Sequence, residues 1–256
     1  MKPSVDIVIP VYNEESVLPR SILLLVEFVN KNISNPWRIV IADNGSTDNT
    51  KTVSEALGQR HPGVEYLQIP RKGRGIALKT AWLDSTADIV MYMDADLSTE
   101  LTALPPTLNA IENGAHIVIG NRFHKNSQTT RSFKRTLISF LYNLLIKSFF
   151  LSSFSDAQCG FKALTKHSAQ LLLPVIKNNN WFLDTEMLII ADHNNFIIKQ
   201  IPVTWIEDTN STVNIIKTAT EDIRGLLRLR FTKMPQLTPP YIKPEESKHV
   251  GDHIYK

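Results

Sequence analysis

Apolar runs and longer amphipathic stretches alternate along the first half of the chain. The apolar runs are short and rich in β-branched residues, and they predict strands at Asp6–Val11, Arg38–Ala42, Val64–Ile69, Ile89–Met93 and His116–Ile119. The stretches between them have helical spacing and predict helices at Glu15–Asn30, Asn49–Arg60, Arg74–Ser85 and Leu101–Asn113. Such alternation is typical of an α/β fold with a mostly parallel central sheet and helices on both faces.

The pattern changes after residue 123, where helices with a few short strands are predicted. The clearest late strand is Ile197–Trp205. Proline and charged residues are frequent from Met234 onward, so we expect residues 234–256 to form a poorly ordered tail. We therefore expect one domain at residues 1–233, with a first half at 1–123 and a second half at 124–233.

Charge is distributed unevenly along the chain. The formal net charge of +3 is too small to suggest nucleic-acid binding. Between Glu112 and Asp156 there is no acidic residue, and this acid-free stretch carries Arg122, Lys125, Arg131, Lys134, Arg135 and Lys147. Such a surface can meet phosphates on a small ligand or a membrane. The single cysteine, Cys159, excludes an internal disulfide and favours a reducing compartment. Because Asp6 interrupts the first apolar run, we do not expect a signal peptide there.

Polar residues follow each of the predicted strands. In an open α/β sheet, ligands bind beyond the carboxyl ends of the strands, so these residues are candidates for one common site. They are Tyr12, Asn13 and Glu14; Asp43, Asn44 and Gly45; Arg71, Lys72 and Gly73; Asp94 and Asp96; and Asn121 and Arg122.

The segment IVMYMDADLST, residues 89–99, ends an apolar strand with two aspartates. In an extended chain Asp94 and Asp96 would point to the same side, where two carboxylates repel each other unless a cation lies between them. We interpret the pair as a site for Mg²⁺ or Mn²⁺, held by hard oxygen ligands together with the phosphates of a substrate. The alternative is a solvated turn, in which Asp is common.

The loop RKGRGIALK, residues 71–79, differs from the common nucleotide-binding motifs. Leu78 stands where a dinucleotide fingerprint needs its third glycine, and the chain has no GxxxxGK[ST] sequence, which disfavours NAD enzymes and P-loop ATPases. A basic turn that opens a helix, here with Lys72 as the candidate donor contact, can still bind anions through free N–H groups; a plain helix cap would look the same. Asp43 either caps the next helix or accepts a hydrogen bond from a nucleobase or ribose.

Six motifs of this chain resemble those of a known family and occur in the same order. They are VIPVYNEE (8–15), ADNGSTDNT (42–50), RKGRGIAL (71–78), MDADLS (93–98), GNRF (120–123) and DAQCGFKAL (156–164). Together they resemble family 2 glycosyltransferases with the GT-A fold, and more narrowly the enzymes that transfer a sugar from a nucleotide sugar to dolichyl or undecaprenyl phosphate. The resemblance implies a Rossmann-like nucleotide-sugar half followed by an acceptor half.

The resemblance also implies roles for individual residues. Toward the UDP- or GDP-sugar donor it implies Pro10, Tyr12 and Glu14 at the base, Asp43 at the nucleoside, Asp94, Ala95 and Asp96 at the metal and diphosphate, and Arg122 at phosphate. On the acceptor side it implies Asp156, Gln158, Lys162, Asp184 and Glu186. Two positions depart from the family pattern: Asn44 replaces a second aspartate, and Thr212 stands where relatives carry a basic residue.

A phosphate acceptor would simplify the chemistry. Its oxygen is already anionic near neutral pH, so it can attack the anomeric carbon without a strong base, and the resemblance implies inversion there. The candidate catalytic carboxylates, Asp156 and Glu186, would orient the acceptor, or one would act as base for an acceptor hydroxyl; structural hydrogen bonding is the alternative.

Three other functions compete with transfer to a polyprenyl phosphate as interpretations of the sequence. The first is transfer to a hydroxyl of a saccharide or lipid-linked sugar. The second is nucleotide transfer, which is disfavoured because PVYNEE stands where such enzymes carry a glycine-rich signature. The third is a non-catalytic membrane-bound subunit, which is disfavoured because both acids of the metal motif are present.

One stretch, Leu137–Phe154, is strongly apolar but too polar at Asn143 and Lys147 for a clear membrane span. Ser139, Asn143 and Lys147 recur every four residues and predict a helix with one polar stripe and a wide apolar face. We interpret it as a helix lying in the membrane interface, with Arg131, Lys134 and Arg135 near anionic headgroups. The alternative is a buried packing or dimer helix. We therefore expect peripheral association with the cytoplasmic face of a membrane.

Overall fold

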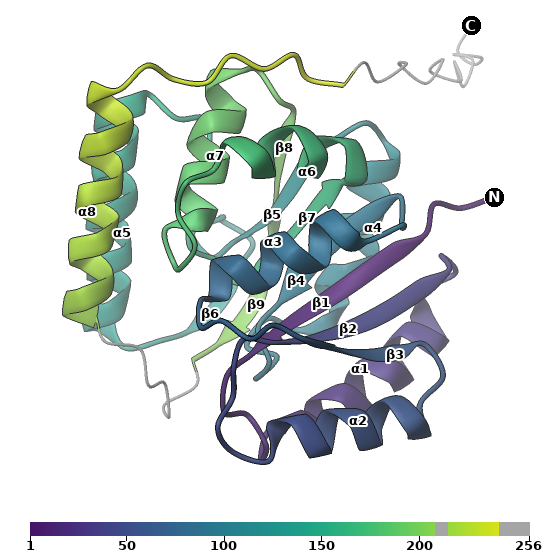
Figure 1. Cartoon of the computed structure of the whole chain (residues 1–256). Helices are drawn as coiled ribbons and strands as arrows, with labels where there is room; N and C mark the ends of the chain where they lie inside the picture. Colours follow the sequence, from purple (N-terminus) through teal and green to yellow (C-terminus); the bar gives the residue numbers. More distant parts are fainter. Residues whose placement is uncertain (208–214, 241–256) are drawn as a thin grey trace, which may run out of the picture.

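A seven-stranded sheet runs through the computed structural model, which describes residues 1–207 and 215–240 (Figure 1). In spatial order its strands are β3 (Val64–Gln68), β2 (Trp37–Asp43), β1 (Val5–Val11), β4 (Ile89–Met93), β7 (Phe161–Thr165), β5 (Ile117–Asn121) and β8 (Ile198–Pro202). Neighbouring strands are parallel except at β7, which runs antiparallel to β4 and β5. The predicted α/β fold with a mostly parallel sheet is confirmed.

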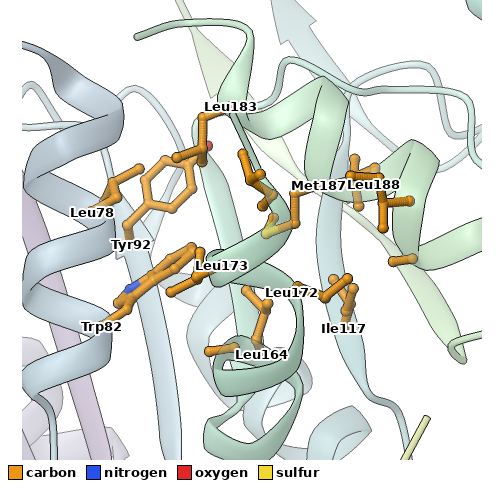
Figure 2. Close-up of a cluster of buried hydrophobic side chains, with 14 of the residues drawn as sticks. Leu78, Trp82, Tyr92, Ile117, Leu164, Leu172, Leu173, Leu183, Met187 and Leu188 are labelled. Carbon is orange, nitrogen blue, oxygen red and sulfur yellow. The ribbon is translucent and has the colours of Figure 1, made fainter. Parts of the chain in front are cut away.

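Helices cover both faces of this sheet. They are α1 (Leu18–Asn32), α2 (Thr50–Arg60), α3 (Arg74–Asp84), α4 (Leu104–Glu112), α5 (Phe133–Phe150), α6 (Lys166–Leu172), α7 (Leu183–His193) and α8 (Ile215–Phe231), with 3-10 turns at Leu101–Ala103 and Leu173–Val175. One core lies between the sheet and α3, α6 and α7; Figure 2 shows Trp82 of α3 beside Tyr92 of β4 in this core. A second core lies on the other face, against α1, α2 and α4.

The late strand predicted at Ile197–Trp205 is divided between two sheets. β8 ends at Pro202, and the chain continues as β9 (Thr204–Ile206), which pairs in parallel with β6 (Gln128–Thr130). The division occurs at Val203, whose N–H donates to Ser127 Oγ and whose C=O accepts from Gln128 N. These bonds turn the chain away from β5 and bring Trp205 toward the carboxyl edge of the main sheet.

The apolar helix of the second half differs from the predicted one in position, and the structure shows which of its faces is turned inward. α5 ends at Phe150, because Leu151 adopts a left-handed conformation (φ 54°) and closes the helix by donating its N–H to Lys147 O; Phe154 is buried in the core. Two residues of the predicted polar stripe face the protein, since Ser139 is buried and Asn143 Oδ1 accepts from Ala157 N, whereas the third, Lys147, is exposed.

The apolar face of α5 is consequently turned outward. Its exposed large apolar side chains are Phe133, Leu137, Ile138, Phe140, Leu141 and Leu144. α8 lies beside α5 at one end of the molecule (Figure 1) and adds Ile223, Leu227 and Phe231. Within the described residues, no helix has the length and apolar character required to cross a membrane.

The start of the predicted tail is held against the domain. Leu237 N donates to Asn194 Oδ1, Asn194 Nδ2 donates to Pro235 O, and His116 Nε2 lies 2.8 Å from Pro240 O. The expectation of poor order therefore does not describe residues 234–240. Residues 241–256, together with Thr212, lie outside the described part of the chain.

The packing of α8 on the domain depends on the absence of a side chain at Gly225. A Cβ atom there would lie 2.3 Å from Phe182 Cε1, and the Phe182 ring is fully buried. We expect Gly225→Ala to lower the free energy of unfolding in urea by about 1–3 kcal/mol. In a Phe182→Leu background, where the ring is absent, Gly225→Ala should lower the free energy of unfolding by a smaller amount. Equal costs in the two backgrounds would contradict this packing.

Candidate active site

The ends of β1 and β2 are joined to the glycine-containing loop by one amide. Asn44 Nδ2 donates to Val11 O at 2.7 Å, and Asn44 Oδ1 accepts from Gly73 N at 3.3 Å. An aspartate could not donate the first of these bonds, because an ionised carboxylate is only an acceptor. The departure from the family pattern at this position therefore has a structural reason.

The residues predicted to contact the base, nucleoside and phosphates of the donor lie around this junction. Lys72 Nζ sits 3.7 Å from the centre of the Tyr12 ring, and Pro10 and Glu14 are partly exposed. Asp43 is buried, with Oδ1 accepting from Ser46 N and Oδ2 from Tyr66 OH. The structure thus brings the predicted donor residues to one edge of the sheet.

The glycines of the RKGRG loop are required by a close neighbour. A Cβ atom at Gly73 would lie 2.8 Å from Asn179 O, and one at Gly75 would lie 2.6 Å from Asn179 C. Gly73 also has a φ of 152° and, because it lacks a side chain, cannot give α3 a side-chain capping bond. The loop at Asn179, which leads into α7, therefore packs directly on the candidate phosphate loop.

Asp94 and Asp96 lie in a turn after β4, not on an extended strand. Leu97 closes the turn by donating its N–H to Asp94 O and adopts a φ of 53°. Ser98 holds Asp96 through its N–H and its hydroxyl. Burial raises the pKa of Asp94, and the charge of Asp96 adds to this rise while Arg74 opposes it. The predicted repulsion is thus present, although the extended geometry that suggested it is not.

The Asp94 carboxylate is packed against Gly160. A Cβ atom at Gly160 would lie 1.7 Å from Asp94 Oδ2, and Asp94 N donates to Gly160 O. Glycine is therefore the residue that fits here, at the start of the antiparallel strand β7. Sequence reasoning did not select Gly160, although it lies within the DAQCGF motif.

Two residues predicted for the acceptor side lie in the interior instead. Lys162 has no exposed surface; its Nζ donates to Cys159 O and Tyr92 OH and lies 3.2 Å from Asp184 Oδ1. Burial alone would raise the pKa of Asp184, but Lys162 and Arg74 outweigh it and hold this pKa below its usual value. In this structure both residues act within a buried network of charges.

Arg122, the predicted phosphate contact, is bound by Asp156. Its Nε and Nη2 each donate to one oxygen of Asp156 at 2.8 Å, and its backbone N–H donates to the same carboxylate. Burial alone would raise the pKa of Asp156, but the Arg122 guanidinium outweighs it and keeps the pKa below its usual value.

A second arginine, Arg131, lies beside this pair. The guanidinium carbons of Arg122 and Arg131 are both 5.3 Å from the centre of the Trp205 ring. Among the described residues, no hydrogen-bond partner is found for the buried Nε of Arg131. Burial, together with the charge of Arg122, lowers the pKa of Arg131 to about 10. The sequence placed Arg131 and Arg122 in one acid-free basic stretch, but the spacing of the two residues gave no signal that both lie over Trp205.

Glu186 and Gln158 are both engaged by other side chains. Glu186 is fully buried and accepts from Lys177 N at 3.0 Å, from Asn178 N at 2.9 Å and from Arg228 Nη2 at 2.8 Å. Gln158 Nε2 donates to Asp222 Oδ2 of α8 at 3.0 Å. Both contacts tie the predicted acceptor side to α8.

The carboxylates of Asp94 and Asp96 fit part of a divalent-metal site. No cluster of three or more His, Cys, Asp or Glu residues suited to a metal occurs in the described chain. Two carboxylates are nevertheless sufficient for Mg²⁺ or Mn²⁺ when phosphate oxygens and water complete the coordination. The Asp94 side chain is 39% exposed and therefore accessible to such an ion.

The chain is similar to sugar-transferring enzymes over most of its length. The sequence model of the family described as Glycosyl transferase family 2 matches residues 6–172, and the chain belongs to this family. Glycosyltransferase AglD of Haloferax volcanii is 29% identical over 96% of this chain, which spans 39% of that protein. Dolichyl-phosphate beta-glucosyltransferase of Dictyostelium discoideum is 27% identical; the match covers 88% of this chain and 73% of that protein. Dolichyl-phosphate beta-glucosyltransferase ALG5A of Trichomonas vaginalis is 31% identical; the match covers 86% of this chain and 72% of that protein.

Solved structures share the fold at low identity. Glucosyl-3-phosphoglycerate synthase from Mycobacterium tuberculosis in complex with uridine diphosphate has a TM-score of 0.67 and 17% identity, with 89% of this chain and 80% of that chain covered. The same enzyme in complex with Mn²⁺, uridine diphosphate and phosphoglyceric acid has a TM-score of 0.66 and 16% identity, and the match covers 90% of this chain and 80% of that chain. The solved structures confirm the predicted GT-A fold, and the family match confirms that the chain is a glycosyltransferase.

The Arg122–Asp156 pair should be important for stability. We expect Arg122→Met to lower the free energy of unfolding by about 3–5 kcal/mol at neutral pH, because it leaves a buried carboxylate unpaired. Since the folded-state pKa of Asp156 is depressed, the stabilisation is present above its unfolded pKa of about 3.9 and is lost as pH falls through the folded value. The deficit of the variant should therefore shrink in acid.

Urea denaturation at several pH values measures this effect. Arg60→Met, which changes an exposed arginine at the end of α2, is the matched control and should stay within about 0.5 kcal/mol of the wild type. If the loss of unfolding free energy in Arg122→Met is small at neutral pH, or does not change with pH, the Arg122–Asp156 pair does not stabilise the fold in this way.

Proposed function

We propose that this glycosyltransferase moves a sugar from a UDP- or GDP-sugar to a polyprenyl phosphate, with inversion, at the cytoplasmic face of a membrane. Dolichyl-phosphate glucosyltransferases among the relatives and UDP in the structural neighbours support the two substrate classes. The observation that carries the proposal is Arg131, which lies over Trp205 beside the paired Arg122 and whose buried Nε has no hydrogen-bond partner among the described residues, so that it offers positive charge to an acceptor phosphate.

The donor would lie across the carboxyl ends of β1, β2 and β4. Tyr12 would contact its base, Lys72 its phosphates and Asp43 its nucleoside, and Asp94 and Asp96 would hold Mg²⁺ or Mn²⁺ at its diphosphate. When bound, the ion supplies positive charge for the leaving nucleoside diphosphate. Mn²⁺ accompanies uridine diphosphate in the structural neighbour, which supports this choice of metal.

The acceptor would contribute its own nucleophile. A phosphate oxygen forms the new bond to the anomeric carbon while the bond from that carbon to the diphosphate oxygen breaks, and the diphosphate keeps the electron pair. Arg131 would orient the acceptor phosphate, and Arg122, held by Asp156, would add positive potential. No proton has to be removed in this step.

The engagement of the candidate bases favours a phosphate acceptor. Asp156 is occupied by Arg122, and Glu186 is occupied by two backbone N–H groups and Arg228. Neither carboxylate is available to take a proton from a sugar hydroxyl, as a hydroxyl acceptor would require. Both are better suited to positioning roles.

One observation supports the hydroxyl acceptor as a second candidate. Asp222 of α8 is buried, and its Oδ1 has no hydrogen-bond partner among the described residues. Burial and the charge of Glu221 raise its pKa to about 7, a value suited to a general base. Asp222→Asn should leave transfer to a phosphate acceptor measurable, whereas it should abolish transfer that depends on this base.

A lipid acceptor agrees with the exposed faces of α5 and α8. Leu141 and Leu144 of α5 are 52% and 50% exposed, and Phe231 of α8 is 81% exposed. We propose that these faces rest on an anionic membrane, with Lys134 and Lys147 near its headgroups. Of the predicted basic cluster, Arg135 is ion-paired with Glu207 and Arg131 lies over Trp205, so Lys134 is the most accessible member.

The transfer reaction is tested with a panel of UDP- and GDP-sugars and a short polyprenyl phosphate. We expect lipid-linked product in Mn²⁺ or Mg²⁺ and none in EDTA. Asp96→Asn should lower kcat/KM at least about 100-fold with little change in melting temperature, while Asp84→Asn, an exposed control at the end of α3, should remain active. Full activity in EDTA would refute the metal; product only with saccharide hydroxyls would refute the phosphate acceptor.

Membrane association is tested by sedimentation with vesicles that contain phosphatidylglycerol. We expect binding that weakens with salt, and a loss of at least about tenfold in affinity for Leu141→Gln with Leu144→Gln, because apolar burial is removed. The matched control is Leu23→Gln with Leu24→Gln on α1, whose side chains are 43% and 42% exposed. Equal losses in the two pairs would contradict the proposed face.

A further inference from the structure

Arg74, the first residue of α3, joins two carboxylates from different halves of the chain. Its Nη1 lies 2.8 Å from Asp184 Oδ2 of α7, and its Nη2 lies 3.4 Å from Asp94 Oδ1 after β4. The guanidinium carbon is also 4.6 Å from the centre of the Tyr92 ring and 4.9 Å from that of Trp181. With a side chain only 9% exposed, Arg74 has little freedom to take another position.

The position of Arg74 is set mainly by Asp184. The contact to Asp184 is the shorter of the two, and Asp184 is itself fixed by Tyr92 OH at 2.7 Å and by Lys162 Nζ at 3.2 Å. A planar guanidinium that is bound by one carboxylate and flanked by two rings presents its remaining N–H groups in a fixed direction. That direction leads to Asp94.

Asp94 is thereby held on three sides. Arg74 is at Oδ1, Gly160 lies against Oδ2, and the backbone N–H of Asp94 donates to Gly160 O. We propose that Arg74 is a positioning residue for the metal ligand Asp94, and that Asp184 on α7 holds Arg74 in place. This inference rests on the proposed function, because it takes Asp94 to bind the divalent ion.

The opposite role for Arg74 would be competition with the ion for Asp94. A competing arginine would form its tighter ion pair with the metal ligand, whereas Arg74 forms it with Asp184 and leaves 39% of the Asp94 side chain exposed. Outer-shell groups that fix a ligand in this way commonly change metal affinity by about 10–100-fold. The two roles predict opposite signs, since loss of a competitor would tighten metal binding.

The test measures binding of Mn²⁺ alone to the full chain, from the electron paramagnetic resonance signal of the free ion. We expect Arg74→Met to weaken binding about 10–100-fold. Arg74→Lys keeps the charge but cannot bridge both carboxylates, so it should also weaken binding. The matched control is Arg60→Met, an exposed arginine at the end of α2, which should bind as the wild type does. Unchanged or tighter binding by Arg74→Met would overturn the proposal.

A second variant tests whether Asp184 holds Arg74 in place, without removing the arginine itself. Asp184→Asn keeps the shape of the side chain, and its melting temperature reports whether the fold persists. We expect weaker Mn²⁺ binding, and no further loss when Arg74→Met is added, because the two residues act in series. Additive losses would overturn the role of Asp184. If the wild type binds Mn²⁺ neither alone nor with uridine diphosphate, or if Asp96→Asn binds as tightly as the wild type, the metal site of the proposed function fails instead.

Discussion

Lys162 carries an ammonium group into a position with no exposed surface, on the antiparallel strand between β4 and β5. An unpaired charge there would destabilise the fold by an amount on the order of several kcal/mol, so its neighbours have to neutralise it. Asp184 does so, and because Asp184 also binds Arg74, which reaches Asp94, charges alternate from the interior to the metal motif. The geometry of the site thus follows from the neutralisation of a buried lysine.

Strand direction explains how the two halves meet at this point. β7 begins at the carboxyl edge of its neighbours, so the segment just before it enters the site directly: Asp156 binds Arg122, and Gly160 lies against Asp94. One short segment therefore contacts both the proposed donor side and the proposed acceptor side. A parallel strand in this place would have brought its carboxyl end there instead.

The sequence was most informative where a local pattern decides the structure. Strand β4 has the predicted bounds, and the polar residues after each strand do share one edge of the sheet. It was least informative where partners are distant in the chain: Asp184 lies 110 residues from Arg74, and no spacing rule connects them. The stripe on α5 shows a third case, since periodicity separates the two faces of a helix but does not say which face is turned inward.

The bond from Asn44 to Val11 has a consequence for the chemical ageing of the protein. An asparagine followed by glycine is prone to deamidation, because the small Gly45 lets the following backbone nitrogen attack the side-chain carbonyl. In this structure the Asn44 amide is buried, donates to Val11 O and accepts from Gly73 N, so it is withheld from that attack. Conversion to aspartate would remove the side-chain donor to Val11 O and leave only the backbone N–H of residue 44 on that oxygen. The folded state thereby protects the amide that links β1 to the RKGRG loop.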